Sequence, residues 1–183
     1  HNWPGMDVGK IGVHNGACMA AADFFEIYIT GSGGHAAIPD LTIDPIPCGA
    51  AIVQSLQSIV SRRITALEPA VVSVTIFEAG SALNVIPGAA RLAGTARSFS
   101  PEVRELLEES IRDITQSTAK AFGCGVEIDW QPGYPPTVNH EDESSRAVSV
   151  ASDVLGAENI ITDLPPSMGA EDFAFMLGEK PGS

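Results

Sequence analysis

The sequence is poor in basic residues, and this scarcity excludes several kinds of partner. Only 10 Lys and Arg stand against 23 Asp and Glu in 183 residues, so the formal net charge is −13. Nucleic-acid binding depends on Lys and Arg that neutralise phosphates, and adhesion to an anionic membrane face needs a basic patch. We expect neither for this chain. An anionic small substrate stays open, because one local arginine can bind a carboxylate within an acidic protein.

Long apolar runs and cysteine motifs are also lacking. No apolar run of about 18 residues predicts a transmembrane helix, and no signal-peptide pattern opens the chain. Cys18, Cys48 and Cys124 are odd in number and lack zinc-ligand spacing. Small or apolar residues surround them, which favours reduced, buried thiols in a cytoplasmic protein.

The chain begins at His1 without Met and stops at Ser183 without a closing element, which favours an internal piece of a longer polypeptide.

Strand and helix patterns alternate through the middle of the chain. Alternating apolar residues predict strands at 22–30, 71–79, 89–99 and 126–130. Apolar stripes at helical spacing predict helices at 46–63 and 103–122. The order β-α-β-β-α-β is typical of an α+β, ferredoxin-like fold, with a four-stranded antiparallel sheet and two helices on one face. An exposed strand edge would then be free to meet a second copy.

Local signals mark where these elements begin and end. Asp44-Pro45 and Ser100-Pro101 each place a favoured N-cap residue before a proline, which suits the first helical position. Gly123 is placed to end the second helix in a left-handed turn. The Pro- and Gly-rich segment 131–136 is a credible domain boundary. Beyond it, 144–155 has a helical pattern.

A glycine-rich turn carries the most informative histidine. Gly31, Gly33 and Gly34 end the first strand and His35 follows at once, with Pro39 stiffening the exit. The glycines let the backbone bend in ways that a Cβ would forbid. The turn therefore holds an imidazole at a loop tip, where function tends to be located. By itself, the turn fits equally well a histidine that merely faces water.

Five sequence blocks together resemble one family. They are Gly-Ser-Gly-Gly-His-Ala-Ala-Ile-Pro at 31–39, Asp-Pro at 44–45, Asn-Val-Ile-Pro at 84–87, Gly-Thr-Ala-Arg at 94–97, and Met-Gly-Ala-Glu-Asp-Phe at 168–173. In this order they are similar to the M20 metallopeptidases. The nearest branch is that of aminoacylases, hippurate hydrolases and indoleacetyl-amino-acid hydrolases. The opening His-Asn-Trp-Pro resembles that branch's metal-binding histidine segment.

The resemblance implies a domain organisation. M20 enzymes have an α/β catalytic domain with two divalent metals and an inserted lid domain that makes the dimer contact. Residues 1–16 would end the first catalytic segment, 17–131 would be the lid, and 132–183 would be part of the returning catalytic segment. The expected partners are a second copy of the chain through the lid and a small N-acyl amino acid or dipeptide.

The resemblance also implies roles for three lid residues. His35 would reach across the dimer and donate to the charge that grows on an amide oxygen during hydrolysis. Asn84 would contact the same substrate, although an Asn that caps its own loop is an alternative. Arg97 would bind the substrate's α-carboxylate through two parallel hydrogen bonds. Without the resemblance, an exposed strand arginine paired with a glutamate would be the default interpretation.

Metal ligation is the least complete part of the pattern. His1 resembles a family ligand, and imidazole suits zinc or manganese. The family's other ligands are not found in the sequence, and a stable site needs about three or four protein ligands. We therefore expect two divalent ions, zinc or manganese, in the intact enzyme and little or no specific metal on this chain alone. Glu171 and Asp172 match a segment near the family's active site, with no role assigned.

The leading hypothesis is a metal-dependent amidohydrolase that cleaves N-acyl amino acids such as hippurate, with this chain, by itself inactive, supplying the lid. An aminopeptidase or dipeptidase of the same family is one alternative. A non-catalytic ferredoxin-like dimerisation module is another, since one fold serves many functions. Arg97 favours substrates with a free carboxylate.

His14 and His140 match no motif, and we expect them to be solvated.

Overall fold

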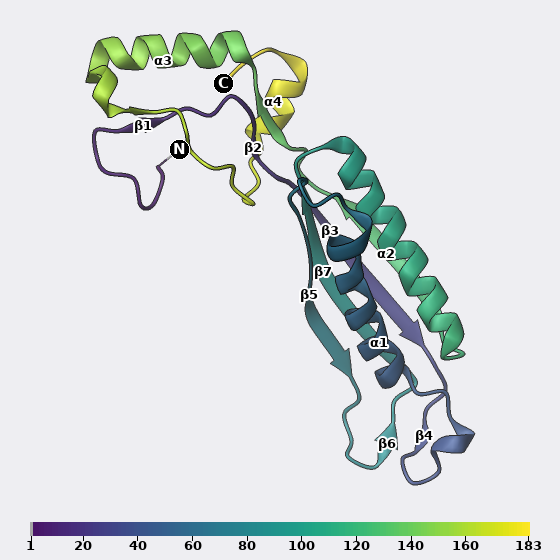
Figure 1. Cartoon of the computed structure of the whole chain (residues 1–183). Coiled ribbons are helices and arrows are strands. Elements are labelled where there is room, and N and C mark those ends of the chain that lie inside the picture. The colour runs from purple at the N-terminus through teal and green to yellow at the C-terminus, as the bar shows by residue number, and fades with distance from the viewer. Residues whose placement is uncertain (1) are drawn as a thin grey trace. The chain divides into compact units, whose positions relative to one another are not determined.

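The computed structural model describes residues 2–183, and the chain divides into two units (Figure 1). The sheet unit comprises residues 22–133. The flanking unit comprises the described residues up to 21 together with 134–183. The assignment of 1–16, 17–131 and 132–183 to catalytic and lid domains stays a prediction.

Four strands form the sheet of the sheet unit, in the order β5-β7-β3-β8. They are β3 (Ala21–Thr30), β5 (Ala70–Ala79), β7 (Ala89–Ser98) and β8 (Gly125–Pro132). The pairs β5–β7 and β3–β8 are antiparallel. Because the first and third strands along the chain lie at the centre, the order matches the predicted ferredoxin-like topology.

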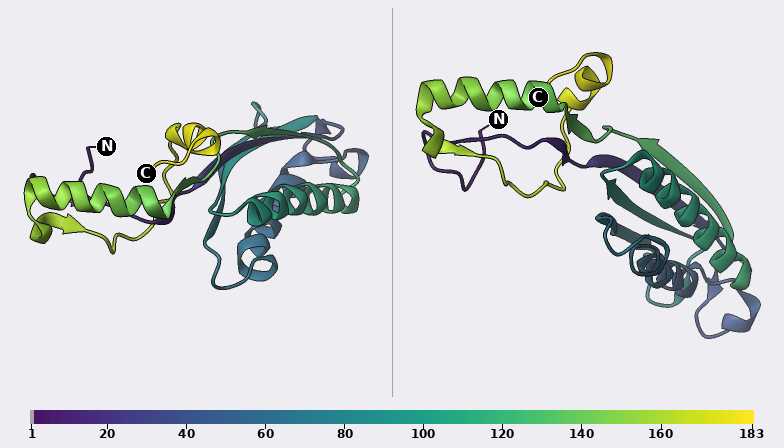
Figure 2. Two further views of the ribbon diagram at one scale, coloured as in Figure 1. Left: turned by 90° about the horizontal axis from the view of Figure 1, so that it is seen from above. Right: turned by 45° about the horizontal axis from the view of Figure 1, so that its top comes forward.

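Two helices, α1 (Pro45–Ser58) and α2 (Pro101–Ala121), cover one face of this sheet (Figure 2). A π-helical turn, Ile59–Arg63, extends α1 to the predicted end. The predicted caps are confirmed, because the Asp44 carboxylate accepts from the Ile46 amide at 2.9 Å and the Ser100 hydroxyl accepts from the Val103 amide at 3.2 Å. Gly123 has the expected positive φ of 73° after α2.

The core of the sheet unit lies between the sheet and these helices. Phe25, Ile27 and Ile29 of β3 are fully buried, as their alternation predicts, and the Phe25 ring stacks with Trp130 of β8 at 6.4 Å. Full burial of one such side chain contributes about 1.5–3 kcal/mol. Cys48 and Cys124 belong to this core. Burial and then the neighbouring Cys124 thiol raise the pKa of Cys48 to about 12, so its thiol stays protonated.

The flanking unit is built from short pieces. Strand β1 (Ile11–Gly12) pairs in parallel with β10 (Ile160–Ile161), and β2 (Gly16–Met19) pairs antiparallel with β9 (Thr137–Asn139). Its helices are α3 (Glu141–Leu155), which covers the predicted 144–155, and α4 (Phe173–Glu179). Within residues 2–183, no helix combines the length and apolar character required to cross a membrane.

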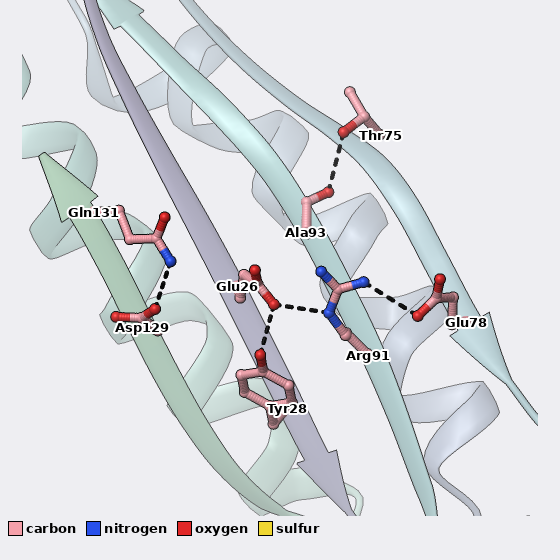
Figure 3. A network of polar contacts seen from close by, with 8 residues as sticks. All are labelled: Glu26, Tyr28, Thr75, Glu78, Arg91, Ala93, Asp129 and Gln131. Carbon is pink, nitrogen blue, oxygen red and sulfur yellow. Dashed lines mark hydrogen bonds and ion pairs between the residues drawn. The ribbon is translucent and has the colours of Figure 1, made fainter. Parts of the chain in front are cut away.

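A polar network occupies the face of the sheet that the helices leave open (Figure 3). Arg91 of β7 donates to Glu26 of β3 at 2.7 Å and to Glu78 of β5 at 3.1 Å. The Tyr28 hydroxyl donates to the same Glu26 carboxylate at 2.6 Å. Hydrogen bonds from Arg91 and then from Tyr28 hold the pKa of Glu26 below its ordinary value. The Glu26 charge therefore stabilises the folded state at neutral pH.

We expect Glu26→Gln to be less stable than the wild type at pH 7, and the difference to shrink as pH falls. A carboxyl whose pKa is lowered by folding stabilises the protein above its unfolded value, near 4.5, and loses that contribution as pH falls through the folded value. Urea midpoints at pH 7 and below pH 4 measure this. Asp129→Asn is the control, since Asp129 contacts Gln131 on the same face. A pH-independent difference for Glu26→Gln would contradict the expectation.

Candidate functional site

His35 and Asn84 lie together beyond the carboxyl end of β3. Strand β4 (Gly34–His35) pairs antiparallel with β6 (Val85–Ile86), which sets His35 opposite Val85. The Ala36 amide donates to the Asn84 carbonyl at 3.0 Å. Figure 1 shows β4 and β6 at the same end of the sheet unit. Two residues that are 49 positions apart in the sequence therefore share one exposed tip.

The glycines of this tip are needed for close approach of backbone segments. Gly31, Gly33 and Gly34 all have negative φ, so the expected unusual bend is not what requires them. A Cβ on Gly33 would lie 2.6 Å from the Ile86 carbonyl oxygen. A Cβ on Gly31 would overlap the Ile43 carbonyl, whose oxygen accepts from the Ser32 amide at 2.9 Å. The missing side chains let β4, β6 and the following loop pack together, which fixes the backbone of His35.

The exposed imidazole of His35 is held in one tautomer by its own turn. The Ala37 amide donates to His35 Nδ1 at 3.1 Å, and the Ile38 amide donates to the His35 carbonyl at 2.9 Å. An Nδ1 atom that accepts a hydrogen bond carries the lone pair, so the proton of the neutral ring is on Nε2. His35 therefore presents an Nε2–H donor to its surroundings.

The Asn84 side chain is exposed and forms no hydrogen bond with any of residues 2–183. Its backbone carbonyl is engaged, but the amide group does not cap the loop that carries it. The alternative interpretation of Asn84 as a loop cap is therefore wrong. Both the donor and the acceptor of its side chain remain open to a ligand.

Arg97 lies at the other end of the sheet. It is opposite Val71 near the end of β7, whereas Asn84 precedes the start of that strand at Ala89. Strand residues rise roughly 3.3 Å each, so the eight steps from Ala89 to Arg97 span about 26 Å. One chain consequently cannot bring His35 and Arg97 to the same small substrate.

The Arg97 guanidinium lies over an aromatic ring and has no carboxylate partner among the residues that the structure describes. Its Cζ lies 5.8 Å from the centroid of the half-exposed Phe24 ring on β3. No hydrogen bond or ion pair joins the Arg97 side chain to another of residues 2–183. The default interpretation as an arginine paired with a glutamate is therefore wrong. In a protein with 23 acidic residues, this guanidinium keeps its donors available.

A buried ion pair next to Phe24 was not predicted from the sequence. Asp23 is 2% exposed, and both of its carboxylate oxygens accept from Arg104 of α2, one of them at 2.8 Å. The Gly133 amide donates to the same carboxylate at 3.0 Å, and the Thr95 hydroxyl donates to the Asp23 carbonyl at 2.8 Å. The hydrogen bonds from Arg104 to Asp23 raise the pKa of Arg104 above its ordinary value. Through its carboxylate and its backbone carbonyl together, Asp23 joins β3 to α2, β7 and the residue after β8.

Glu171 and Asp172, to which the sequence assigned no role, interact with each other. A hydrogen bond from Asp172 lowers the pKa of Glu171, and the same bond raises the pKa of Asp172. Glu171 also accepts from the Phe173 amide at 3.2 Å. Both residues precede α4, which begins at Phe173.

The described histidines and acids form no metal centre. Within residues 2–183, no group of three His, Cys, Asp or Glu side chains could hold a metal ion. The predicted ligand His1 lies outside the described residues. His14 and His140 are half-buried rather than solvated: His14 Nδ1 lies 2.8 Å from the Leu164 carbonyl oxygen, and the Gly182 amide donates to His140 Nδ1 at 3.2 Å.

Comparison with known proteins gives the family. The family model described as the peptidase dimerisation domain matches residues 21–122, which is more than half of the chain. The chain belongs to the M20 peptidase family. It is 42% identical to an N-acetylcysteine deacetylase from Bacillus subtilis, over all of this chain and 47% of that protein. It is 37% identical to the IAA-amino acid hydrolase ILR1-like 4 from Arabidopsis thaliana, over 97% of this chain and 41% of that protein.

A solved M20 structure has the same fold. The YXEP protein of Bacillus subtilis, described as a dinuclear metal-binding peptidase, is 34% identical to this M20 chain. It superposes with a TM-score of 0.79 over all of this chain and 44% of its own. The M20 chain spans about half the length of the curated relatives that it matches. Dinuclear metal binding therefore occurs in the family, and residues 2–183 of this chain do not by themselves build such a site.

Proposed function

We propose that the protein is an amidohydrolase that cleaves N-acyl amino acids, acting as a homodimer whose copies share each active site. His35 and Asn84 of one copy would act on the same substrate as Arg97 of the other. The separation of these residues supports the proposal, since about 26 Å of strand lies between Ala89 and Arg97 within one chain. A two-fold dimer can bring opposite ends of two identical units together.

The chemistry assigns His35 to the amide oxygen. Hydrolysis adds water to the carbonyl carbon, places negative charge on its oxygen, and then breaks the C–N bond. The Nε2–H of His35 is the donor that this charge requires, and the Ala37 amide fixes it in place. Asn84, exposed at the same tip, offers an amide that can contact the acyl group or the amide itself.

Arg97 accounts for the carboxylate end of the substrate. A guanidinium binds a carboxylate through two parallel hydrogen bonds, and Arg97 has both donors available among the described residues. This favours N-acyl amino acids and dipeptides over substrates that lack a free carboxylate. Relatives named as N-acetylcysteine deacetylase and IAA-amino acid hydrolase have names that fit such substrates.

We further propose two divalent ions, zinc or manganese, in the complete enzyme. When bound, such ions would activate water and polarise the carbonyl. The described residues do not by themselves fit a metal pair, and in this proposal His35, Asn84 and Arg97 act on the substrate. A reducing, cytoplasmic location is part of the same proposal, supported by the free thiols of Cys48 and Cys124 in the core.

A mixed dimer tests the shared site. His35→Ala and Arg97→Ala chains of the full-length enzyme, with different affinity tags, would be co-expressed and the heterodimer purified. In the heterodimer one site has both mutations and the other has neither, so we expect about half of the wild-type kcat/KM. Each variant homodimer should be strongly impaired, and a differently tagged pair of His35→Ala chains is the control. A heterodimer no more active than the homodimers would contradict the shared site.

A further inference from the structure

Among residues 2–183, the Arg97 guanidinium lies over the ring of Phe24 and forms no hydrogen bond or ion pair. Phe24 is 49% exposed on the open face of the sheet, although it is a large apolar side chain. Two other arginines of the sheet unit are held by carboxylates: Arg91 by Glu26 and Glu78, Arg104 by Asp23. Arg97 is thus supported by an aromatic face where its neighbours are supported by charge.

The contact with the Phe24 ring leaves the hydrogen-bond donors of Arg97 available to a substrate. A cation–π contact to a ring uses none of the five N–H donors of a guanidinium in hydrogen bonds, so they stay available to a ligand. A carboxylate partner would instead occupy the edge that an incoming substrate carboxylate needs. The ring restrains a long, flexible side chain without consuming its donors, which lowers the entropy lost when a ligand binds.

The backbone around Phe24 and Arg97 is cross-linked, so the ring and the guanidinium keep their register. Thr95, two residues before Arg97 on β7, donates through its hydroxyl to the carbonyl of Asp23, the residue before Phe24 on β3. The Asp23 carboxylate is held by Arg104 and by the Gly133 amide. The next residue, Phe25, points to the opposite face and stacks with Trp130. Phe24 therefore stands on a rigid support.

We propose that Phe24 is the positioning residue of the carboxylate receptor formed by Arg97. The inference rests on the proposed function and adds to it the side chain that prepares Arg97 for a substrate carboxylate. Phe24 touches neither the amide bond nor any group assigned to His35. Its loss should weaken recognition of the carboxylate and leave the rest of the reaction unchanged.

The experiment uses the full-length metal-loaded enzyme and two substrates, an N-acetyl amino acid and its C-terminal primary amide, which lacks the carboxylate. The measured quantity is the ratio of kcat/KM for the acid to kcat/KM for the amide. We expect Phe24→Leu to lower this ratio roughly three- to fivefold, mainly through KM for the acid. Phe24→Tyr, which keeps the ring, should retain the wild-type ratio. Tyr28→Phe, on the same strand and face, is the matched control and should also retain it.

A double-mutant cycle separates positioning from a general structural role. Arg97→Ala should abolish the preference for the acid, and adding Phe24→Leu to it should change nothing further. Equal loss of activity on both substrates in Phe24→Leu, or an additive effect in the Arg97→Ala background, would overturn the inference alone. A wild-type enzyme without preference for the acid would overturn the proposed carboxylate recognition as well. Matched melting curves would verify that every variant is folded.

Discussion

Replacing His35 by alanine in the full-length dimer is expected to lower kcat by about 10²–10³ and to change KM little. A pre-placed donor aimed at a developing oxyanion contributes about 3–4 kcal/mol to transition-state stabilisation. In this chain the donor is Nε2–H, because the Ala37 amide occupies Nδ1 at 3.1 Å. An interaction made mainly in the transition state affects kcat more than KM. Steady-state kinetics on an N-acyl amino acid measure both constants.

Asp40→Asn is the matched control for His35→Ala. Asp40 is exposed in the short 3-10 turn Pro39–Leu41 that follows the histidine, so its replacement changes the tip without touching the imidazole. We expect near-normal kinetics for this variant. Near-normal kcat in His35→Ala itself would mean that the imidazole is only part of a turn, and the shared-site mechanism would be wrong.

Asp23→Asn is expected to destabilise the protein by about 3 kcal/mol. Removing one partner of a buried ion pair leaves the other charge uncompensated, which costs about 3–5 kcal/mol when both partners are buried. The Arg104 side chain is 25% exposed, so the lower end of that range applies. The Gly133 amide also loses a charged acceptor. Urea unfolding at neutral pH measures the change.

Glu108→Gln provides the comparison for Asp23→Asn. Glu108 pairs with Arg112 one turn along α2, and both side chains are more than a third exposed. Exposed i, i+4 pairs contribute only about 0.3–0.5 kcal/mol. The double variant Asp23→Leu/Arg104→Leu should be more stable than Asp23→Leu alone, because no unpaired charge remains. Equal losses of unfolding free energy in Asp23→Asn and Glu108→Gln would show that burial does not increase the contribution of the Asp23–Arg104 pair to stability.

The Asp23–Arg104 ion pair also affects the position of Phe24, which contacts Arg97. Asp23 joins the start of β3 to α2 and to the end of β8, and Phe24 follows it directly. A loosened Asp23 would let the Phe24 ring shift beneath Arg97. We therefore expect Asp23→Asn to weaken carboxylate recognition as well as stability, whereas Phe24→Leu should weaken recognition with little loss of stability.

Sequence alone determined the elements of the sheet unit and the family. Helix starts at Asp44 and Ser100 and the helix end at Gly123 depend on residues within about one turn, so local chemistry is sufficient. The alternation of Phe25, Ile27 and Ile29 fixed which face of β3 is buried, because side chains change sides at every residue. The five motif blocks indicated the family and made His35, Asn84 and Arg97 the candidate site residues.

Only the tertiary structure decided how these residues are placed. Asp23 and Arg104 are 81 positions apart, and nothing local indicates that a strand acid and a helix arginine will meet. The strand register places Arg97 at the end of the sheet away from His35, and it places the Phe24 ring next to the Arg97 guanidinium. The glycines of the tip are explained by backbone segments that come from other parts of the chain. Contacts between distant segments follow from packing of the whole unit, because sequence patterns describe each element separately.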